Sequence, residues 1–251
     1  GRLENLYENR RADKKLSAIS VVRMTEGCKI HIISQLNLRR IIVVSDSLAA
    51  KALTRKLRSW GLKVSYMPYR DDVLIPRVGF SVQYVRERMK TLSDIITGNT
   101  DAVVTCIDTL LQLFPKRELI EKYSLRITFD SRITPQEAAV KLALAGYTRQ
   151  DIVQEEGDFA VRGDILDIYS ADGNAYRINF FDDSIESIKQ INPGNMLPVA
   201  DMDSVFVPPL SDIILDEKGA EEAKAGLGEH LGNKHAMDAY EQIHEGAIDP
   251  S

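Results

Sequence analysis

The stretch between residues 40 and 113 alternates short β-branched runs with segments of helical periodicity, and this alternation restricts the possible folds more than any other feature of the chain. Three runs have the composition of buried strands: residues 40–45 (RIIVVS), 62–67 and 101–106 (DAVVTC). The segments between them place apolar residues at helical spacing and end at Gly61 and Gly98. Strands buried on both faces and separated by helices predict βαβ units and a mainly parallel sheet.

A different pattern begins after residue 114. Residues 124–129 (SLRITF) alternate apolar and polar side chains, with Phe129 on the apolar side, which is typical of a half-exposed strand. Thr134 as cap, Pro135 at the first helical position and Glu137 completing a capping box then predict the start of a helix. Four strand candidates follow in close succession: residues 158–162, 165–169, 176–181 and 184–191. We expect an antiparallel meander packed on one helix.

Together the two patterns predict an α/β chain in which a small α+β domain is inserted into a parallel-sheet scaffold. We expect the first part of the scaffold over residues 1–113 and the inserted domain over residues 114–192. Residues 193–251 begin with a proline-rich connector, are expected to return to the scaffold, and end in an acidic, weakly helical tail.

Composition excludes several classes of function. The chain has 32 Lys and Arg against 37 Asp and Glu, so it lacks the positive field that attracts nucleic acid, and direct DNA or RNA binding is disfavoured. Its apolar runs are strand-sized, which predicts no contact with a membrane. Cys28 and Cys106 lie far apart without a CxxC pattern, and the first residues contain no apolar signal segment. We therefore expect free thiols and a cytoplasmic location.

One loop has the sequence position of a phosphate-binding loop. In nucleotide-binding α/β domains, the turn after the opening strand cradles phosphate with glycines and a lysine. Here a predicted strand at residues 18–24 is followed by Gly27, Cys28 and Lys29. Cys28 separates the glycine from the lysine, and Ile30 stands where a magnesium-binding Ser or Thr belongs. We interpret this loop as a degenerate P-loop that does not bind nucleotide.

The sequence contains no recognisable catalytic or metal-binding arrangement. No Ser or Cys has the setting of a nucleophile elbow. Cys28 and His31 could share a helix face, but two ligands do not make a closed metal site. Asp182 and Asp183, like the Arg-Gly-Asp triplet at residues 162–164, are expected in turns between strands. We expect no catalytic residues, no metal and no cofactor in this chain.

Arginines form the most informative polar pattern. Strand alternation places Phe159 and Val161 inward and Ala160 and Arg162 outward, and it likewise turns Arg177 and Asn179 outward from their strand. In a meander, Arg162 and Arg177 then share one exposed face, and Arg149 lies in position to rim it. Guanidinium groups on a rigid sheet suit carboxylate recognition across an interface. From periodicity alone, a simply solvated sheet face remains the alternative.

Three segments carry a resemblance to a known family: GYTR at residues 146–149, GDFAVRGDILDIY at 157–169 and YRINFFDDSIESI at 176–188. In order and spacing they resemble the UvrA-binding domain shared by UvrB and the bacterial transcription-repair coupling factors (Mfd). Residues 81–88 and 103–114 (VVTCIDTLLQLF) are similar to the coupling factors. UvrB would carry an intact P-loop and a long Tyr-rich hairpin, which this chain lacks. The resemblance therefore favours the N-terminal, UvrB-like region of a coupling factor.

The resemblance implies a degenerate P-loop-NTPase-like scaffold that holds a UvrA-binding domain, with UvrA contacts at Arg149, Arg162 and Arg177. Two positions depart from UvrB, which has an arginine at Ala160 and a glutamate at Asn179. The Asn-Pro-Gly-Asn loop at residues 192–195 also replaces the run that usually follows the last strand of the domain.

The same resemblance implies partners and cofactors outside this chain. The ATP-driven translocase motor, with its ATP and Mg, and the regions that bind RNA polymerase and DNA would lie downstream. A C-terminal domain of the parent protein would mask the UvrA-binding face. We expect a docking fragment that recruits nucleotide excision repair to stalled RNA polymerase. The alternatives are a UvrB-type nucleotide-dependent excision-repair helicase subunit and a purely structural piece of its parent protein.

Overall fold

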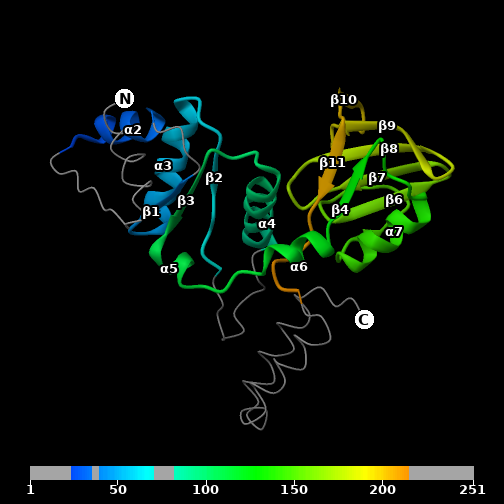
Figure 1. Ribbon diagram of the computed structural model, residues 1–251, viewed down its shortest axis with the longest axis horizontal. Coiled ribbons are helices and arrows are strands. Elements are labelled where there is room, and N and C mark those ends of the chain that lie inside the picture. The colour runs from blue at the N-terminus through cyan, green and yellow to red at the C-terminus, as the bar shows by residue number, and fades with distance from the viewer. Residues whose placement is uncertain (1–23, 36–39, 71–81, 215–251) are drawn as a thin grey trace, which may run out of the picture.

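The computed structural model describes residues 24–35, 40–70 and 82–214. A first group of elements comprises α2 (Glu26–Gln35), β1 (Arg40–Val44), α3 (Ser47–Ser59), β2 (Val64–Tyr66), α4 (Val82–Thr97), β3 (Ala102–Cys106) and α5 (Ile107–Leu110). A second group comprises α6 (Arg117–Lys122), β4 (Leu125–Thr128), α7 (Pro135–Leu144), β5 (Thr148–Arg149), β6 (Asp158–Arg162), β7 (Ile165–Tyr169), β8 (Ala175–Phe181), β9 (Ser184–Ile191), β10 (Pro198–Asp201) and β11 (Ser204–Val207). Helix α4 is the part of the first group that lies nearest the second group (Figure 1).

The first group is built on a parallel sheet, as the alternation predicts, and the strand order is β1-β3-β2. The central strand β3 is buried along its whole length, and α3 packs on the sheet through the fully buried Ala50 and Leu57. Asp46 caps α3 by accepting a hydrogen bond from the Ala49 amide. Gly61, with φ of +84°, allows the chain to turn after this helix.

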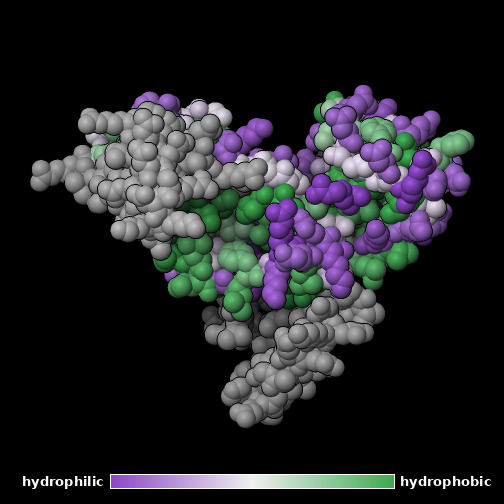
Figure 2. Space-filling view, in the orientation of Figure 1, coloured by the Kyte–Doolittle hydropathy of each residue, from purple (hydrophilic) through white to green (hydrophobic). Residues whose placement is uncertain are grey.

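The edge strand β1 differs from its expected burial. Ile41 and Val43 are 65% and 45% exposed, so the expectation that this strand is buried on both faces is wrong. The reason is that α3 is the one described helix that makes an extensive contact with β1, and it covers a single face. A hydrophobic area lies where the parallel sheet leads into α5 (Figure 2), and Ile107 and Leu110 of this helix are exposed.

The second group is built on a six-stranded sheet with the order β10-β9-β8-β7-β6-β5, antiparallel except for the short β5–β6 pair. The predicted meander β6–β9 is confirmed, and so is the mixed α/β fold. Both proposed turns are also confirmed: residues 163–164 join β6 to β7, and Asp182 and Asp183 join β8 to β9. Asp182 has φ of +58°, a left-handed conformation that Asp tolerates in tight turns.

Helix α7 begins as its sequence predicts. Thr134 accepts from the Glu137 amide, and the Glu137 carboxylate accepts from the Thr134 amide, which completes the capping box around Pro135. The helix packs against β6 and buries Ala138 and Leu142. It therefore covers one face of the six-stranded sheet at the end formed by β5 and β6.

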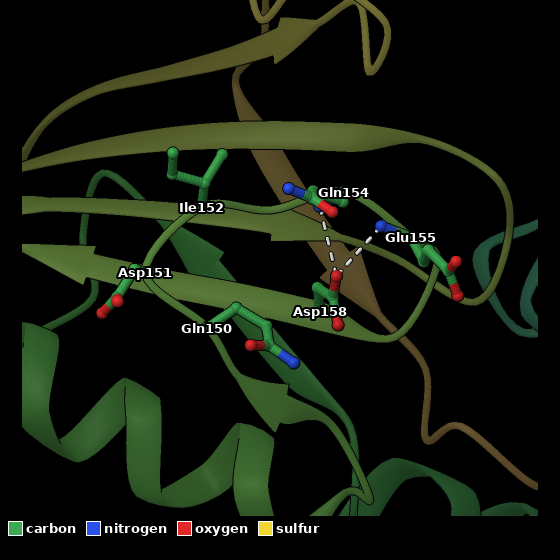
Figure 3. A pocket seen from close by; sticks show the side chains of 6 residues that line it. All are labelled: Gln150, Asp151, Ile152, Gln154, Glu155 and Asp158. Atoms are coloured by element: carbon green, nitrogen blue, oxygen red, sulfur yellow. Dashed lines mark hydrogen bonds between the residues drawn. The ribbon is translucent and has the colours of Figure 1, made fainter.

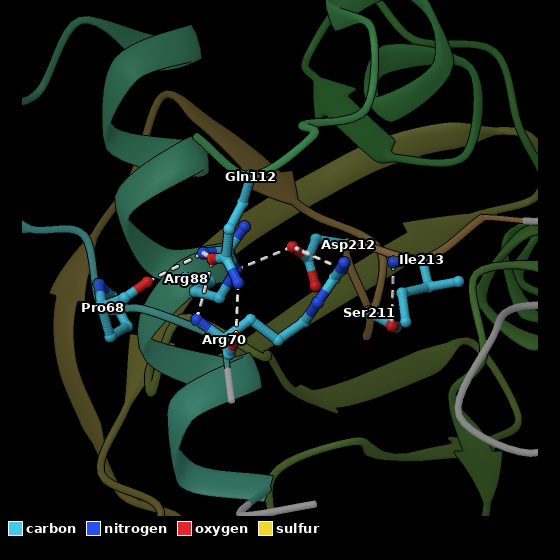
Figure 4. Close-up of polar contacts among 7 residues, drawn as sticks. All are labelled: Pro68, Arg70, Arg88, Gln112, Ser211, Asp212 and Ile213. Atoms are coloured by element: carbon cyan, nitrogen blue, oxygen red, sulfur yellow. Dashed lines mark hydrogen bonds and ion pairs between the residues drawn. The ribbon is translucent and has the colours of Figure 1, made fainter. Parts of the chain in front are cut away.

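A buried polar network joins α4 to the segment that follows β11 (Figure 4). Arg88 donates to Asp212 over 2.7 Å and to the Pro68 carbonyl over 2.8 Å. Its guanidinium also lies 4.9 Å from the centre of the Phe114 ring. A single cluster of buried apolar residues runs from Met89 and Leu92 of α4 into the second sheet. The two groups of elements are therefore packed together.

Several expectations fall on the ends of the chain or are changed by the structure. The predicted strand at residues 18–24 lies almost entirely outside the described residues, as does the tail from residue 216. Phe129 follows β4 and is 49% exposed, because the strand ends before it. The domain limits at residues 113 and 192 stay predictions; β10 and β11, which follow residue 192, pair with β9 and β4.

Two further expectations concern the cysteines and the membrane. Both cysteines are free thiols, Cys28 exposed and Cys106 buried, as the absence of a CxxC pattern predicts. None of the helices in the described part of the chain combines the length and the apolar character needed to cross a membrane.

Candidate protein-docking face

Strand register defines a polar face on the side of the six-stranded sheet opposite its buried face. Residues paired across antiparallel strands point to the same side, and two such rows cross β6, β7, β8 and β9. One row is Ala160, Asp167, Arg177 and Lys189, and the other is Arg162, Ile165, Asn179 and Ser187. We call these eight residues the outer face. Between them along the strands, Phe159, Leu166, Ile168 and Ile178 point into the core.

Asp167 lies at the centre of the outer face and joins its two arginines. Asp167 Oδ1 accepts from Arg177 Nε over 2.6 Å, and Asp167 Oδ2 accepts from Arg177 Nη2 over 2.9 Å. Arg162 Nη2 donates to the same Oδ2 over 2.5 Å. The carboxylate has no exposed surface, whereas the side chains of Arg162 and Arg177 are 51% and 25% exposed. The structure thus brings Arg162 and Arg177 together, and it pairs both with an acid.

The electrostatics of this cluster favour a negatively charged partner. Hydrogen bonds to Asp167 raise the pKa of the Arg177 guanidinium above its ordinary value, so Arg177 keeps its charge. Two guanidinium groups share a single carboxylate, and Lys189 stands opposite Arg177 in the next strand. The cluster therefore carries a net positive charge even though the chain as a whole is acidic.

Ala160 is buried, contrary to the expectation that it points outward into solvent. Register does place it on the outer face, directly opposite Asp167, but its exposed fraction is 0%. A methyl group in the middle of a sheet face is covered by the longer side chains around it. Asn179 is partly buried and donates to Ser187 Oγ over 2.9 Å.

Arg149 lies apart from the other two arginines. It is exposed on the edge strand β5 and is in register with Phe159, whose side chain points into the core. Its Cβ therefore lies on the opposite side of the sheet from Arg162 and Arg177. No hydrogen bond or ion pair joins Arg149 to either of them.

Two exposed apolar side chains accompany the polar cluster, and the sequence reading did not single them out. Ile165 is 37% exposed and stands between Arg162 and Asn179 in its row. Phe181 is 77% exposed and alternates along β8 with Arg177 and Asn179. Alternation along residues 176–181, continued beyond Arg177, would have predicted that Phe181 also points outward. The pairing of Asp167 with two arginines could not be found without the cross-strand register.

The residues interpreted as a degenerate P-loop are not a loop. Gly27, Cys28 and Lys29 lie in the first turn of helix α2, and the preceding Glu26 forms an ion pair with Lys56 of α3. The expectation of a turn over residues 27–29 is therefore wrong, because helical hydrogen bonding begins with the Lys29 amide, which donates to the Thr25 carbonyl.

A polar hollow of about 360 Å³ lies in the loop between β5 and β6 (Figure 3). Its lining residues are Gln150, Asp151, Ile152, Gln154, Glu155 and Asp158. Asp158 points inward and accepts from the backbone amides of Gln154 and Glu155, at 3.1 and 2.9 Å. This carboxylate holds its own loop in place, and the described residues contain no cluster of side chains suited to hold a metal ion.

Part of the chain, including this face, matches a known family. The family model described as the UvrB interaction domain matches residues 125–212. The matched segment begins at β4, ends beyond β11, and contains the whole outer face together with Asp212.

The curated relatives carry a common name. The chain is 28% identical over 185 residues to the transcription-repair-coupling factor of Rickettsia typhi, which covers 73% of this chain and 16% of the relative. It is 34% identical over 137 residues to the factor of Helicobacter pylori, and the match covers 54% of this chain and 13% of the relative. The Bacillus subtilis factor is 27% identical over 163 residues, covering 63% and 14%. The matched part of the chain therefore spans about one seventh of the length of these relatives, and the resemblance seen in the sequence is confirmed.

Proposed function

We propose that this chain is a docking fragment of a transcription-repair coupling factor and that it binds UvrA through the outer face of its UvrB interaction domain. The observation that carries the proposal is the convergence of Arg162 and Arg177 on the buried Asp167, within the segment that matches that domain. In the proposed role, the chain brings UvrA, and with it nucleotide excision repair, to RNA polymerase stalled at a lesion.

The chemistry of the outer face suits a protein partner. Arginine forks bind carboxylates with defined geometry, and arginines and aromatic residues are the side chains most often found at the energetic centres of interfaces. Phe181 and Ile165 supply apolar surface beside the charges. Phe181 and the net positive charge also argue against a simply solvated sheet face.

Arg149 is the third proposed contact and lies at the rim. It is exposed on the edge strand β5, and register gives it the other side of the sheet from Arg162. A partner that extends around this edge reaches Arg149 as well as the outer face. Arg149→Ala then weakens UvrA binding less than a change at Arg162, because rim contacts contribute less than central ones.

The remaining activities of a coupling factor are proposed to reside outside this chain. ATP, Mg, DNA and RNA polymerase would bind to other parts of the longer protein, and another domain of that protein would cover the outer face until UvrA is needed. We propose no catalytic role for the chain itself. The UvrB-type helicase alternative is not favoured, because the curated relatives are coupling factors.

Calorimetric titration of the chain with purified UvrA tests the proposal. We expect a saturable complex whose affinity falls as the salt concentration rises, because a basic cluster contributes to it. A titration with ATP and Mg in place of UvrA is expected to give no saturable signal. Absence of a UvrA complex at any salt concentration contradicts the docking role, and saturable ATP binding revives the helicase alternative.

A further inference from the structure

Asp167 lies between the two arginines of the outer face, on the strand that separates theirs. It belongs to β7, while Arg162 comes from β6 on one side and Arg177 from β8 on the other. Its carboxylate accepts three hydrogen bonds, two from Arg177 and one from Arg162, and has no exposed surface. A solvent-exposed ion pair has no such arrangement, since its members are held loosely and screened by water.

This arrangement fixes the direction of both guanidinium groups before any partner arrives. Two like charges on nearby strands repel each other, and long side chains that are free in solution lose rotamer freedom when they dock. A buried carboxylate between them reduces the repulsion and orients both side chains through hydrogen bonds. A partner then meets a pair of arginines that is already ordered.

The geometry also leaves donors available for a partner. Asp167 engages Nε and Nη2 of Arg177 and only Nη2 of Arg162. Nη1 of each arginine donates to no described protein atom, and Arg162 keeps its Nε as well. These N–H groups lie on partly exposed side chains and suit the oxygens of an acidic side chain.

We propose that Asp167 is a positioning residue that holds Arg162 and Arg177 as a preformed receptor for a carboxylate of the protein partner. The proposal rests on the proposed function, because the carboxylate would belong to UvrA. Asp167 does not touch the partner in this arrangement and acts through the two arginines.

A positioning role of Asp167 and a purely electrostatic role of the cluster predict opposite effects of Asp167→Asn on UvrA binding. Asp167→Asn adds one positive charge to the outer face. If charge alone governs binding to an acidic partner, the variant associates faster and binds more tightly. If Asp167 positions the arginines, the variant dissociates faster and binds more weakly, because the ordered pair is lost.

Surface plasmon resonance with immobilised UvrA separates the two cases. We expect Asp167→Asn to raise the dissociation rate at least about tenfold without slowing association. Asp164→Asn is the matched control: this exposed residue of the adjoining turn undergoes the same change of charge, and its carboxylate contacts neither arginine. The control is expected to keep the dissociation rate of the unchanged chain. An affinity of Asp167→Asn equal to or above that of the control overturns the proposal.

A second, milder variant tests the same role in case Asp167→Asn fails to fold. Arg177→Lys keeps the charge but cannot donate two hydrogen bonds to Asp167 side by side, so it is expected to dissociate faster with an unchanged association rate. A dissociation rate equal to that of the unchanged chain contradicts the positioning role. Thermal unfolding of each variant is measured in parallel.

A measurement without UvrA distinguishes failure of this inference from failure of the docking role. In the free chain, NMR is expected to resolve a slowly exchanging Nε–H signal of Arg177, and this signal is lost in Asp167→Asn. If the signal is present while UvrA does not bind, the docking role fails and the ordered arginine pair stands. If the signal is absent from the unchanged chain, the positioning role fails whatever UvrA does.

Discussion

Arg88 Nε lies 2.7 Å from Asp212 Oδ2, and neither side chain has any exposed surface. This pair links the middle of α4 to the chain just after β11, at the end of the segment that matches the UvrB interaction domain. Gln112 and Arg70 border the same network (Figure 4). A charged pair therefore lies where the parallel-sheet group and the interaction domain pack together.

Breaking this pair at one side is expected to be costly. Asp212→Leu alone leaves the Arg88 charge buried without its acid and should lower the free energy of unfolding by about 3–5 kcal/mol. Arg88→Met should cost less, because Arg70 still lies 3.5 Å from Asp212. The double replacement should cost much less, because Arg88 Nη2 and Asp212 Oδ1 have no hydrogen-bond partner even in the unchanged chain. Urea unfolding of the three variants measures these values. A double variant as unstable as the sum of the single ones contradicts this account.

Tyr147 supplies a second buried link. Its hydroxyl donates to the Pro208 carbonyl over 2.8 Å and accepts from the Ala171 amide over 3.0 Å, and burial raises its pKa. Tyr147→Phe leaves both backbone groups without this partner and should cost about 1–3 kcal/mol of unfolding free energy. Tyr84→Phe, at a ring that is 40% exposed, serves as the control in the same denaturation experiment and should change little. Equal stabilities of the two variants would show that the Tyr147 hydroxyl contributes nothing.

The capping box of α7 predicts a pH dependence. The hydrogen bond from the Thr134 amide, followed by that from its hydroxyl, lowers the pKa of the Glu137 carboxyl below its ordinary value of 4.5. A lowered folded-state pKa means that the contribution is present above 4.5 and is lost as the pH falls through the lowered value. Thermal unfolding of the unchanged chain and of Glu137→Ala should therefore differ at pH 7 and converge in acid. A difference that persists unchanged in acid contradicts the assignment.

The sequence predicts local structure well where the cause is local. The capping residues of α7, the turns after Arg162 and Phe181, and the parallel strands all follow from short patterns. The pattern fails where distant segments decide the outcome. β11 pairs with β4 across the whole interaction domain, and no short-range signal specifies this pairing.

The candidate site was likewise predicted only where a single strand determines the result. Period-two alternation placed Arg162 and Arg177 on one face, because each strand alone determines that property. Asp167 looked like an ordinary polar residue of its strand, since its partners come from the two neighbouring strands. The helical start of α2 was missed because a Gly and a Lys after an apparent strand are also typical of a phosphate-binding turn.

Phe181 is predicted to contribute to binding without contributing to folding. At 77% exposure, Phe181→Ala should change the free energy of unfolding by less than about 0.5 kcal/mol. Its loss from an interface should weaken UvrA binding by about 1–2 kcal/mol. Phe129→Ala, at another exposed phenylalanine, is the control for a general loss of apolar surface. Equal UvrA affinities of the two variants, measured by calorimetry, would remove Phe181 from the docking face.

The affinity of UvrA for Arg162→Ala, compared with that for the unchanged chain, tests the docking role most directly. Arg117→Ala, which removes an arginine of α6 whose side chain is 63% exposed and pairs with Glu121, is measured beside it. We predict that Arg162→Ala binds UvrA about 30-fold more weakly, a loss of about 2 kcal/mol, while Arg117→Ala binds like the unchanged chain. Equal affinity of the unchanged chain and Arg162→Ala would contradict the assignment of the outer face as the UvrA-binding surface.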